Sequence, residues 1–336
     1  MSIKVLKPGL LTTVQDRGRH GLQHLGIVPC GAMDPYAHAL ANALVGNARD
    51  EATLELTLIG PELLFEEPAL VALCGAELAA KADGQPLPRD RPVWLGAGTR
   101  LATGRAARGC RAYLAIAGGI ALDPVLGSRS TYMPARFGGL HGRALRAGDE
   151  LPLAPLAAEL AAERYPRLAE HAALRGALRT VRWSAPPMTL PEHEPIVVHA
   201  MEGQHFGRFE AAAQRTFFEA TWRVSPESNR MGYRLSGPAL AAAGAGEILS
   251  GPTCLGTVQV PAGGLPIALM ADHQTTGGYP KIAEIAAADV ARMAQLAPGG
   301  TLRFARCTLE EAIELRRAAH ARHGAALRAL AWEYGT

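Results

Sequence analysis

Strict alternation of apolar and polar residues marks one stretch of the chain, residues 53–59. Leu54 and Leu56 fall on one face of this stretch, whereas Thr53 and Glu55 fall on the other. A period of two residues is typical of a half-buried β-strand. Shorter apolar runs predict further strands at residues 3–6, 70–73, 111–116, 196–199, 257–260, 267–270 and 302–305. Their irregular spacing and the many Gly and Pro turns favour a β-rich barrel or sandwich over a doubly wound parallel sheet.

A helical pattern begins at Asp34-Pro35, where an N-cap acceptor precedes proline at the first helical position. An apolar stripe follows it and ends before Gly46: Ala37, Leu40, Ala41 and Leu44. Residues 288–296 predict a second helix. Thr308-Leu309-Glu310-Glu311 is a capping box and predicts a C-terminal helix that runs toward Arg322.

The segment from Pro155 to Arg179 is rich in Ala, Leu, Glu and Arg and lacks the strand pattern found on either side. We interpret it as a helical connector between two halves. The five residues Arg19–Gln23 resemble Arg230–Arg234, which suggests two pseudo-repeated halves but is too short to prove a duplication. The expected organisation is a β-rich half with one helix at 1–154, a helical connector at 155–180, a second β-rich half at 181–306 and a helix at 307–336.

Composition restricts the class of protein. Of the 336 residues, 48% are hydrophobic and 19% are charged, which is enough apolar material for a sizeable core. The net charge of +3 is small, so we expect no nucleic-acid partner. The longest apolar stretch, residues 112–122, is too short to cross a bilayer, and no signal peptide is visible, so we expect a cytoplasmic protein. The five widely spaced cysteines suggest reduced thiols rather than a zinc site or disulfide framework.

Three segments combine glycines with polar and charged residues, a composition that lets backbone approach a ligand closely. The first segment, residues 14–34, carries Gln15, Asp16, Arg19 and Asp34. Arg19 could bind a carboxylate or phosphate. The alternative is a solvent-exposed loop with a structural Asp–Arg pair.

The second segment, residues 127–132, contains Arg129 and Ser130. It does not match Gly-x-Ser-x-Gly, so we expect anion binding rather than a nucleophile, with a plain turn as the alternative. The third segment, residues 271–281, follows an apolar strand. Its polar residues are Asp272, His273, Gln274, Thr275, Thr276, Tyr279 and Lys281.

This third segment resembles a site at the edge of a scaffold. Asp272 or His273 could transfer protons, and Lys281 could bind an anion. The alternative is a hairpin whose polar residues only satisfy the backbone. The sequence contains neither a P-loop nor a Gly-x-Gly-x-x-Gly motif, and we predict no metal site.

The same segments together resemble the AHS2 family. The stretches that carry the resemblance are 12–19, 31–34, 41–47, 54–55, 111–119, 126–131, 229–235, 256–261 and 274–280. The sequence departs from the family at Leu265 and in the Ala-rich connector. The family includes the C subunit of prokaryotic 5-oxoprolinase, the protein KipA and part of the urea carboxylase carboxyltransferase domain. The resemblance implies a mainly β fold with some α (α+β) and cyclophilin-like β-barrel architecture, with the barrel expected at 181–306.

The resemblance also implies a function, namely one part of an ATP-dependent enzyme complex that opens 5-oxo-L-proline to L-glutamate by phosphorylating the lactam. The implied partners are an AHS1-type subunit (similar to PxpB or KipI) and a LamB/YcsF-type subunit (similar to PxpA). The implied cofactor is ATP, with or without Mg. One alternative is a biotin-dependent carboxyltransferase whose biotin sits on another chain, since no Ala-Met-Lys-Met segment is present. A second is a KipA-like regulator that binds a KipI-type kinase inhibitor.

On this hypothesis Asp272, Lys281 and Tyr279 are the catalytic candidates. Arg19, Arg129, Arg230 and Lys281 would supply positive charge. The other residues expected to bind substrate or anions are Gln15, Asp16, Asp34, Ser130, Gln259, Gln274, Thr275 and Thr276.

Overall fold

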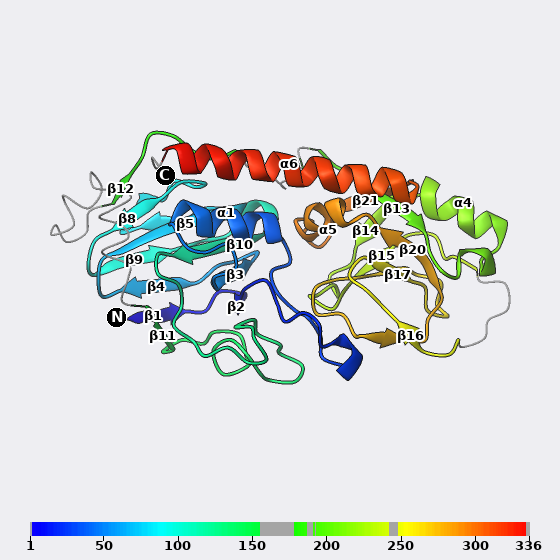
Figure 1. The fold of residues 1–336 in the computed structure, drawn as a ribbon, viewed down its shortest axis with the longest axis horizontal. Helices are drawn as coiled ribbons and strands as arrows, with labels where there is room; N and C mark the ends of the chain where they lie inside the picture. The colour runs from blue at the N-terminus through cyan, green and yellow to red at the C-terminus, as the bar shows by residue number, and fades with distance from the viewer. Residues whose placement is uncertain (1, 155–177, 187–190, 192, 242–247, 334–336) are drawn as a thin grey trace. The chain divides into compact units, whose positions relative to one another are not determined.

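The computed structural model describes residues 2–154, 178–186, 191, 193–241 and 248–333 (Figure 1). The chain divides into two compact units. Unit 1 comprises Met1–Arg19, Cys30–Leu190 and His323–Thr336. Unit 2 comprises His20–Pro29 and Pro191–Arg322.

Unit 1 contains two six-stranded antiparallel sheets. The first sheet has the strand order β11 (Glu150–Pro152), β1 (Ser2–Lys7), β4 (Glu62–Phe65), β9 (Thr99–Ala102), β6 (Lys81–Ala82) and β7 (Gln85–Pro86). The second has the order β12 (Arg179–Thr180), β8 (Val93–Leu95), β5 (Ala69–Leu78), β10 (Ala106–Ile116), β3 (Thr53–Thr57) and β2 (Leu11–Gln15). The two sheets form a sandwich, one of the two alternatives that the turn-rich sequence favoured.

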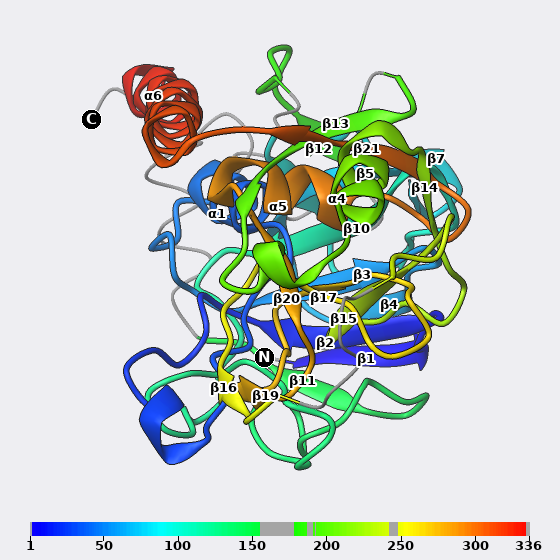
Figure 2. The same cartoon turned by 90° about the vertical axis from the view of Figure 1, so that its right-hand side faces the viewer.

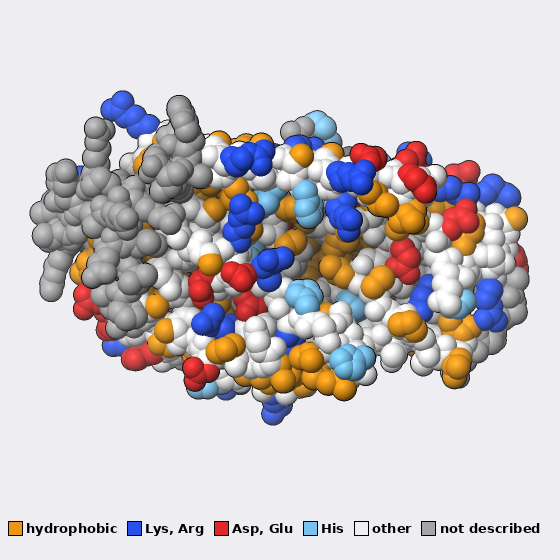
Figure 3. Space-filling view, in the orientation of Figure 1, with side chains coloured by type: hydrophobic (Ala, Val, Ile, Leu, Met, Phe, Trp, Pro, Cys, Tyr) orange, Lys and Arg blue, Asp and Glu red, His pale blue; other side chains and the backbone are white. Residues whose placement is uncertain are grey.

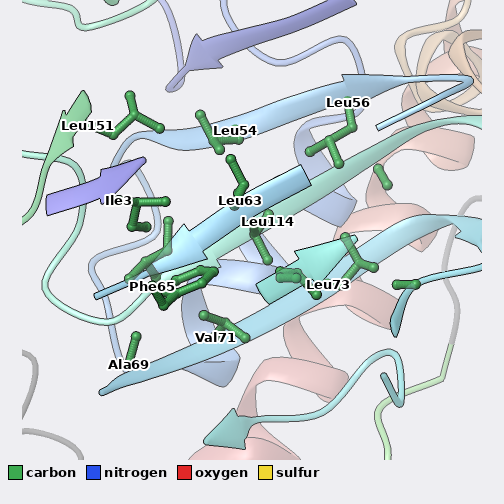
Figure 4. Packing of buried hydrophobic residues seen from close by; sticks show 14 of the residues in the cluster. Ile3, Leu54, Leu56, Leu63, Phe65, Ala69, Val71, Leu73, Leu114 and Leu151 are labelled. Carbon is green, nitrogen blue, oxygen red and sulfur yellow. The ribbon is translucent and has the colours of Figure 1, made fainter. Parts of the chain in front are cut away.

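The core of unit 1 lies between these sheets (Figure 4). Ile3 and Phe65 come from the first sheet, and Leu54, Val71 and Leu114 come from the second. All five side chains are at most 1% exposed. The removal of these closely packed apolar side chains from water supplies most of the free energy that holds the two sheets together.

The polar face of β3 is also buried, which differs from the half-buried strand predicted for this stretch. Thr53 is 0% and Glu55 is 1% exposed. The second sheet buries both faces, because α1 (Pro35–Leu44) covers the face turned away from the first sheet. There the Glu55 carboxylate accepts hydrogen bonds from the Tyr113 hydroxyl (2.7 Å) and the Met33 amide (2.9 Å), so the polar group keeps its partners.

Helix α1 begins as the sequence predicts. The Oδ1 atom of Asp34 accepts hydrogen bonds from the amides of Tyr36 (3.2 Å) and Ala37 (3.0 Å), and Pro35 occupies the first turn. Gly46 follows the helix with φ = 80°, a conformation that glycine adopts without strain.

Unit 2 contains a closed seven-stranded barrel. The strand order is β13 (Ile196–Glu202), β20 (Lys281–Ile285), β17 (Thr257–Gln259), β18 (Ile267–Leu269), β15 (Gly232–Ser236), β14 (Trp222–Val224) and β21 (Thr301–Arg306). The parallel pairing of β13 with β21 closes the barrel, so no sheet edge remains open. A separate two-stranded ribbon, β16 (Gly251–Pro252) with β19 (Thr276–Gly277), lies below the barrel in both views (Figure 1, Figure 2).

Short helices attach to the barrel by specific contacts. The ring of Phe217 in α4 (Ala211–Glu219) stacks on Phe304 of β21 with centroids 4.4 Å apart. The Tyr233 hydroxyl donates to the main-chain carbonyl of Leu296 (3.2 Å), just beyond α5 (Ala287–Ala294). Two 3-10 turns also occur, η1 (Gln23–Leu25) and η2 (Phe206–Arg208).

The observed elements agree with the sequence predictions. Each predicted strand and the helix predicted at 288–296 are confirmed.

Helix α6 (Leu309–Glu333) starts at the predicted capping box: Glu311 accepts from the Thr308 amide (2.8 Å), and Thr308 accepts from the Glu311 amide (3.2 Å). The helix continues beyond Arg322. Leu327 and Leu330 pack in the core of unit 1 beside α1. The boundary between the units therefore falls inside α6.

The predicted connector at 155–180 lies mostly outside the described residues. Arg179–Thr180, at its end, form β12 rather than helix and pair with β8. Ala185 packs in the core of unit 1, whereas His20–Pro29 belong to unit 2, so the observed division of the chain does not follow the expected boundaries.

Acidic and basic side chains are interspersed over the face drawn in Figure 3. All five cysteines are free thiols, and Cys254 is the exposed one. Within the described part of the chain, no helix has the length and apolar character needed to cross a membrane.

Candidate functional site

Asp16 joins the first and second polar segments in unit 1. Its carboxylate accepts hydrogen bonds from the hydroxyls of Ser128 and Ser130 (2.6 Å each) and from the amides of Gly18 (2.7 Å) and Arg129 (2.5 Å). Burial alone would raise the pKa of Asp16, but these donors outweigh it and hold the pKa below its usual value. The structure therefore brings Asp16, Arg129 and Ser130 together, with Asp16 fixing the loop.

Arg19 lies beside this loop and is 2% exposed. Its guanidinium donates to the Ser130 carbonyl (2.5 Å) and lies over the Phe137 ring, 4.7 Å from the centroid. The Nη1 atom is buried without a hydrogen-bond partner, and no carboxylate lies within 4.0 Å of the guanidinium among the described residues. Asp16 takes its hydrogen bonds from hydroxyls and amides rather than from Arg19.

The remaining candidates of unit 1 are engaged in the fold. Arg129 donates to the Leu122 carbonyl (2.6 Å) and to Glu51 (3.2 Å). Gln15 donates to the Thr131 carbonyl (3.3 Å), while its own Oε1 is buried without a partner. Asp34 serves as the cap of α1. These contacts position the loops, and the predicted roles in substrate binding stay predictions.

In unit 2, Arg230 and Asp272 form a bidentate ion pair. The Nε atom lies 2.9 Å from Oδ2 and Nη2 lies 2.8 Å from Oδ1, with side chains 3% and 2% exposed. Both carboxylate oxygens accept from the same guanidinium, so this pair orients the loop that follows β18. In neighbouring His273, Nδ1 lies 2.7 Å from the Gln274 carbonyl oxygen, and burial lowers the pKa of His273.

Lys281, the first residue of β20, is only 3% exposed. Its ammonium donates to the Pro252 carbonyl (2.5 Å) and to Gln204 Oε1 (3.5 Å), both of them neutral acceptors. No carboxylate within 4.0 Å is paired with this ammonium in the described part of the chain. Lys281 is thus a buried cation with no counter-ion among the described residues.

The side-chain amides of two glutamines form a hydrogen-bonded series near Lys281. Gln259, opposite Lys281 in the pairing of β17 with β20, is 2% exposed. Its Oε1 accepts from Gln274 Nε2 (3.1 Å), and its Nε2 donates to the Tyr279 carbonyl (3.4 Å). The ribbon of β16 and β19 passes close by, since a Cβ on Gly277 would lie 2.6 Å from Gln259 Nε2. Gln259, Gln274 and Lys281 are therefore gathered at one place in unit 2.

The other candidates of the third segment sit at its surface. Thr275 holds the loop through its carbonyl, which accepts from the Thr253 amide (3.0 Å), and Thr276 is exposed in β19. Tyr279 is 49% exposed. Their predicted contacts with substrate stay predictions.

Sequence reasoning missed two residues that form hydrogen bonds with Lys281, namely Gln204 and His205. The Nδ1 atom of His205 accepts from the Lys281 amide at 3.3 Å, and burial together with the charges of Lys281 and Arg208 lowers the pKa of His205. Neither residue belongs to a recognisable motif, and only the pairing of distant segments places them beside Lys281.

The buried cations of the described residues fall into two kinds. Arg111 lies 4.0 Å from Glu55, and Arg230 is paired with Asp272. Arg19 and Lys281 have no such carboxylate. Since a buried charge without a partner costs several kcal/mol, these two residues are the strongest candidates for contact with an anionic ligand. No group of three or more His, Cys, Asp or Glu side chains that could hold a metal ion occurs within the described ranges.

Comparison with known proteins identifies the class. The family described as carboxyltransferase domain, subdomain A and B, matches residues 25–306, and the chain belongs to this family. The AHS2 resemblance is thereby confirmed.

Two relatives match over nearly their whole length. The chain is 40% identical to the 5-oxoprolinase C subunit of Escherichia coli (strain K12) over 320 residues, covering 94% of each chain. It is 36% identical to the 5-oxoprolinase C subunit of Haemophilus influenzae, again over 94% of each.

The fold is similar to that of a solved structure, the urea amidolyase of K. lactis, with a TM-score of 0.84 and 30% identity. The likeness covers 97% of this chain but only 20% of that much longer protein. The mainly β fold with some helices is confirmed, and the closed seven-stranded barrel agrees with the expected cyclophilin-like architecture.

Proposed function

We propose that this chain is the C-type component of an ATP-dependent 5-oxoprolinase, a complex that converts 5-oxo-L-proline to L-glutamate. The observation that carries the proposal is the match over 94% of both chains to two proteins named as the C subunit of 5-oxoprolinase. The partners would be an AHS1-type subunit and a LamB/YcsF-type subunit. ATP, with or without Mg, would be the co-substrate, which suits a cytoplasmic complex.

The chemistry explains why ATP is needed. A lactam is a resonance-stabilised amide, so its carbonyl carbon is a poor electrophile. Transfer of the γ-phosphoryl group to the lactam oxygen releases ADP and activates that carbon. Water then adds, the ring C–N bond breaks with a proton going to nitrogen, and a second water releases phosphate from the acyl phosphate. These reaction steps require positioned cations and hydrogen-bond donors around the developing negative charge.

The residues around Lys281 suit this task. A cation with neutral partners keeps its full charge for a ligand, and the low polarity of a buried site strengthens the attraction. The amides of Gln259 and Gln274 can pair with a planar amide, which presents one donor and one acceptor. In unit 1, Arg19 is another cation with no carboxylate partner in the described part of the chain, and by itself it suits a phosphate oxygen.

The test is reconstitution of the complex with the two partner proteins, followed by measurement of ATP hydrolysis and glutamate formation with and without 5-oxo-L-proline. We expect Lys281→Met to lower kcat/KM roughly 100-fold, as removal of a buried charge contact does. Lys81→Met, at an exposed lysine in β6, is the matched control and should retain full activity. Unchanged turnover in Lys281→Met would refute the assignment of Lys281.

A second candidate is a biotin-dependent carboxyltransferase, favoured by the family description and by the 33% identity to the urea amidolyase of Lachancea kluyveri. That match covers only 17% of the relative, which weakens the case for the same activity. Carboxyl transfer from a carboxybiotinyl carrier to urea, with no 5-oxoproline-dependent ATP hydrolysis, would select this function instead.

A further inference from the structure

The end of the Lys281 side chain is enclosed by neutral oxygens. The Pro252 carbonyl at 2.5 Å and Gln204 Oε1 at 3.5 Å accept two of its three hydrogens. A neutral acceptor satisfies a hydrogen but leaves the positive charge uncompensated. At 3% exposure, solvent does little to stabilise that charge. No other described residue accepts from this ammonium or pairs with its charge, which leaves one hydrogen and one unit of charge available to a ligand.

His205 lies beside the main chain of Lys281, and the charge of Lys281 acts on its ring. Because its Nδ1 accepts from the Lys281 amide at 3.3 Å, the neutral ring carries its hydrogen on Nε2. No described residue accepts a hydrogen bond from Nε2. Burial and the positive charges of Lys281 and Arg208 lower the pKa of His205, which favours the neutral ring as the donor.

The backbone leaves room beside the ammonium. A Cβ added to Gly251 in β16 would lie 3.5 Å from Nζ, in ordinary contact. Any larger side chain at this position would occupy the space in front of the ammonium. Gly251 thus permits an atom of a ligand to approach Lys281 from the side of the β16–β19 ribbon.

We propose that Lys281, with His205 as a second donor, forms a receptor for a single carboxylate, so that the site selects lactams that carry a carboxylate over neutral amides. This inference rests on the proposed function and names the feature of the substrate that unit 2 recognises. One cation with one neutral donor balances one negative charge. A phosphate, which carries close to two charges, would remain undercompensated there.

The substrate class follows from this charge count. 5-Oxo-L-proline is an anion at neutral pH, whereas its amide, 5-oxo-L-prolinamide, has the same ring and no charge. Urea is also neutral. A receptor of this kind therefore explains how a member of a family that includes urea enzymes would recognise an acidic lactam.

The test compares the affinities of 5-oxo-L-proline, 5-oxo-L-prolinamide and inorganic phosphate, measured by ligand-observed NMR with the full chain and with the reconstituted complex. The proteins are the wild type, Lys281→Met, His205→Phe and the control Lys81→Met. We expect the wild type and the control to bind the carboxylate at least 10-fold more tightly than the amide. Lys281→Met should bind the two equally, and His205→Phe should lose part of the preference.

Three outcomes would overturn the receptor: a preference that survives in Lys281→Met, phosphate that binds more tightly than 5-oxo-L-proline and displaces it, or no saturable binding to either preparation. The proposed function is judged separately. If the complex turns over 5-oxo-L-proline and Lys281→Met changes kcat at constant KM, the receptor fails while the function stands. If the chain shows the preference but the complex has no 5-oxoproline-dependent ATP hydrolysis, the function fails while the receptor stands.

Discussion

Arg230 and Asp272 bind one another through two parallel hydrogen bonds, 2.9 and 2.8 Å long, with both side chains almost fully buried. The main chain reinforces the pairing, since the Asp272 amide donates to the Arg230 carbonyl at 2.8 Å. The start of β15 and the loop after β18 are thus joined at the entrance to the third polar segment.

Removal of one charge from this pair should destabilise the protein strongly. Asp272→Asn keeps the shape of the side chain but leaves a buried guanidinium without its carboxylate, so the free energy of unfolding should fall by roughly 3 to 5 kcal/mol. Denaturant unfolding measures this change. The exposed pair Lys4–Glu66 provides the control, because solvent screens it and Glu66→Gln should change the free energy of unfolding far less. Equal effects of the two variants would contradict the structural role.

Stability should fall in mild acid because of His38. This side chain is 1% exposed on α1, and burial lowers its pKa from 6.5 to about 4. Above pH 6.5 both the folded and the unfolded chain carry neutral His38. As the pH falls, the unfolded chain binds the proton first, so the contribution is lost between pH 6.5 and 4 and amounts to about 3 kcal/mol.

The measurement for His38 is the free energy of unfolding at a series of pH values. His38→Gln should flatten the curve between pH 6.5 and 4, whereas His24→Gln, at an exposed histidine, should leave it unchanged. A wild-type curve that is already flat in this window would rule out the buried neutral imidazole.

Lys281→Met should separate activity from stability. The substitution keeps a similar length of side chain and removes a buried charge for which the described residues supply no counter-ion. The unfolding free energy should therefore stay the same or rise by about 1 kcal/mol. Kinetics and denaturant unfolding of the same preparations test this. A loss of both activity and stability would instead assign Lys281 a structural role.

Gly277→Ala should displace the amide of Gln259. The added Cβ would lie 2.6 Å from Nε2, too close for a real contact, so Gln259 or the ribbon must move. A shift of this size at a binding site is expected to lower kcat/KM roughly 10- to 100-fold. Gly207→Ala is the control, since nothing lies within 4 Å of its added Cβ. Equal activity of both variants would exclude a role for close backbone approach.

The pH profile of the complex should depend on His205. Protonation would place a hydrogen on Nδ1 facing the Lys281 amide, beside the charges of Lys281 and Arg208, which together with burial lower the pKa of His205 below 6.5. The neutral form therefore predominates at about pH 7, and activity should decline only below pH 6.5. In His205→Gln the acid limb should shift or vanish while activity at neutral pH is partly kept. An unchanged acid limb would exclude His205 as its source.

Local sequence patterns predicted the starts of two helices, because a helix cap depends on residues that are close together in the sequence. The caps at Asp34 and Thr308 depend on hydrogen bonds within three residues, and both form as expected. The faces of β3 could not be derived in this way. The partner of Glu55 is Tyr113, which is distant in sequence, and only the packing of α1 over the sheet buries both.

The candidate site shows the same limit. Glycine-rich composition singled out Lys281 and Arg19, but it could not tell a paired cation from an unpaired one, because Arg230 looked equivalent until Asp272 was found beside it. Gln204 and His205 carry no local signal, since they reach Lys281 only through the pairing of β13 with β20.

The path of the chain limits how the protein can be divided. It leaves unit 1 after Arg19, returns at Cys30, leaves again after Leu190, and returns once more inside α6. Cleavage of the chain at one position therefore cannot release unit 1 or unit 2 as one continuous fragment. A truncation that deletes Leu327 and Leu330 would remove part of the packing around α1 at the opposite end of the sequence. Gene fragments cloned at the apparent midpoint should thus yield incomplete pieces, because each fragment would lack segments of its own core.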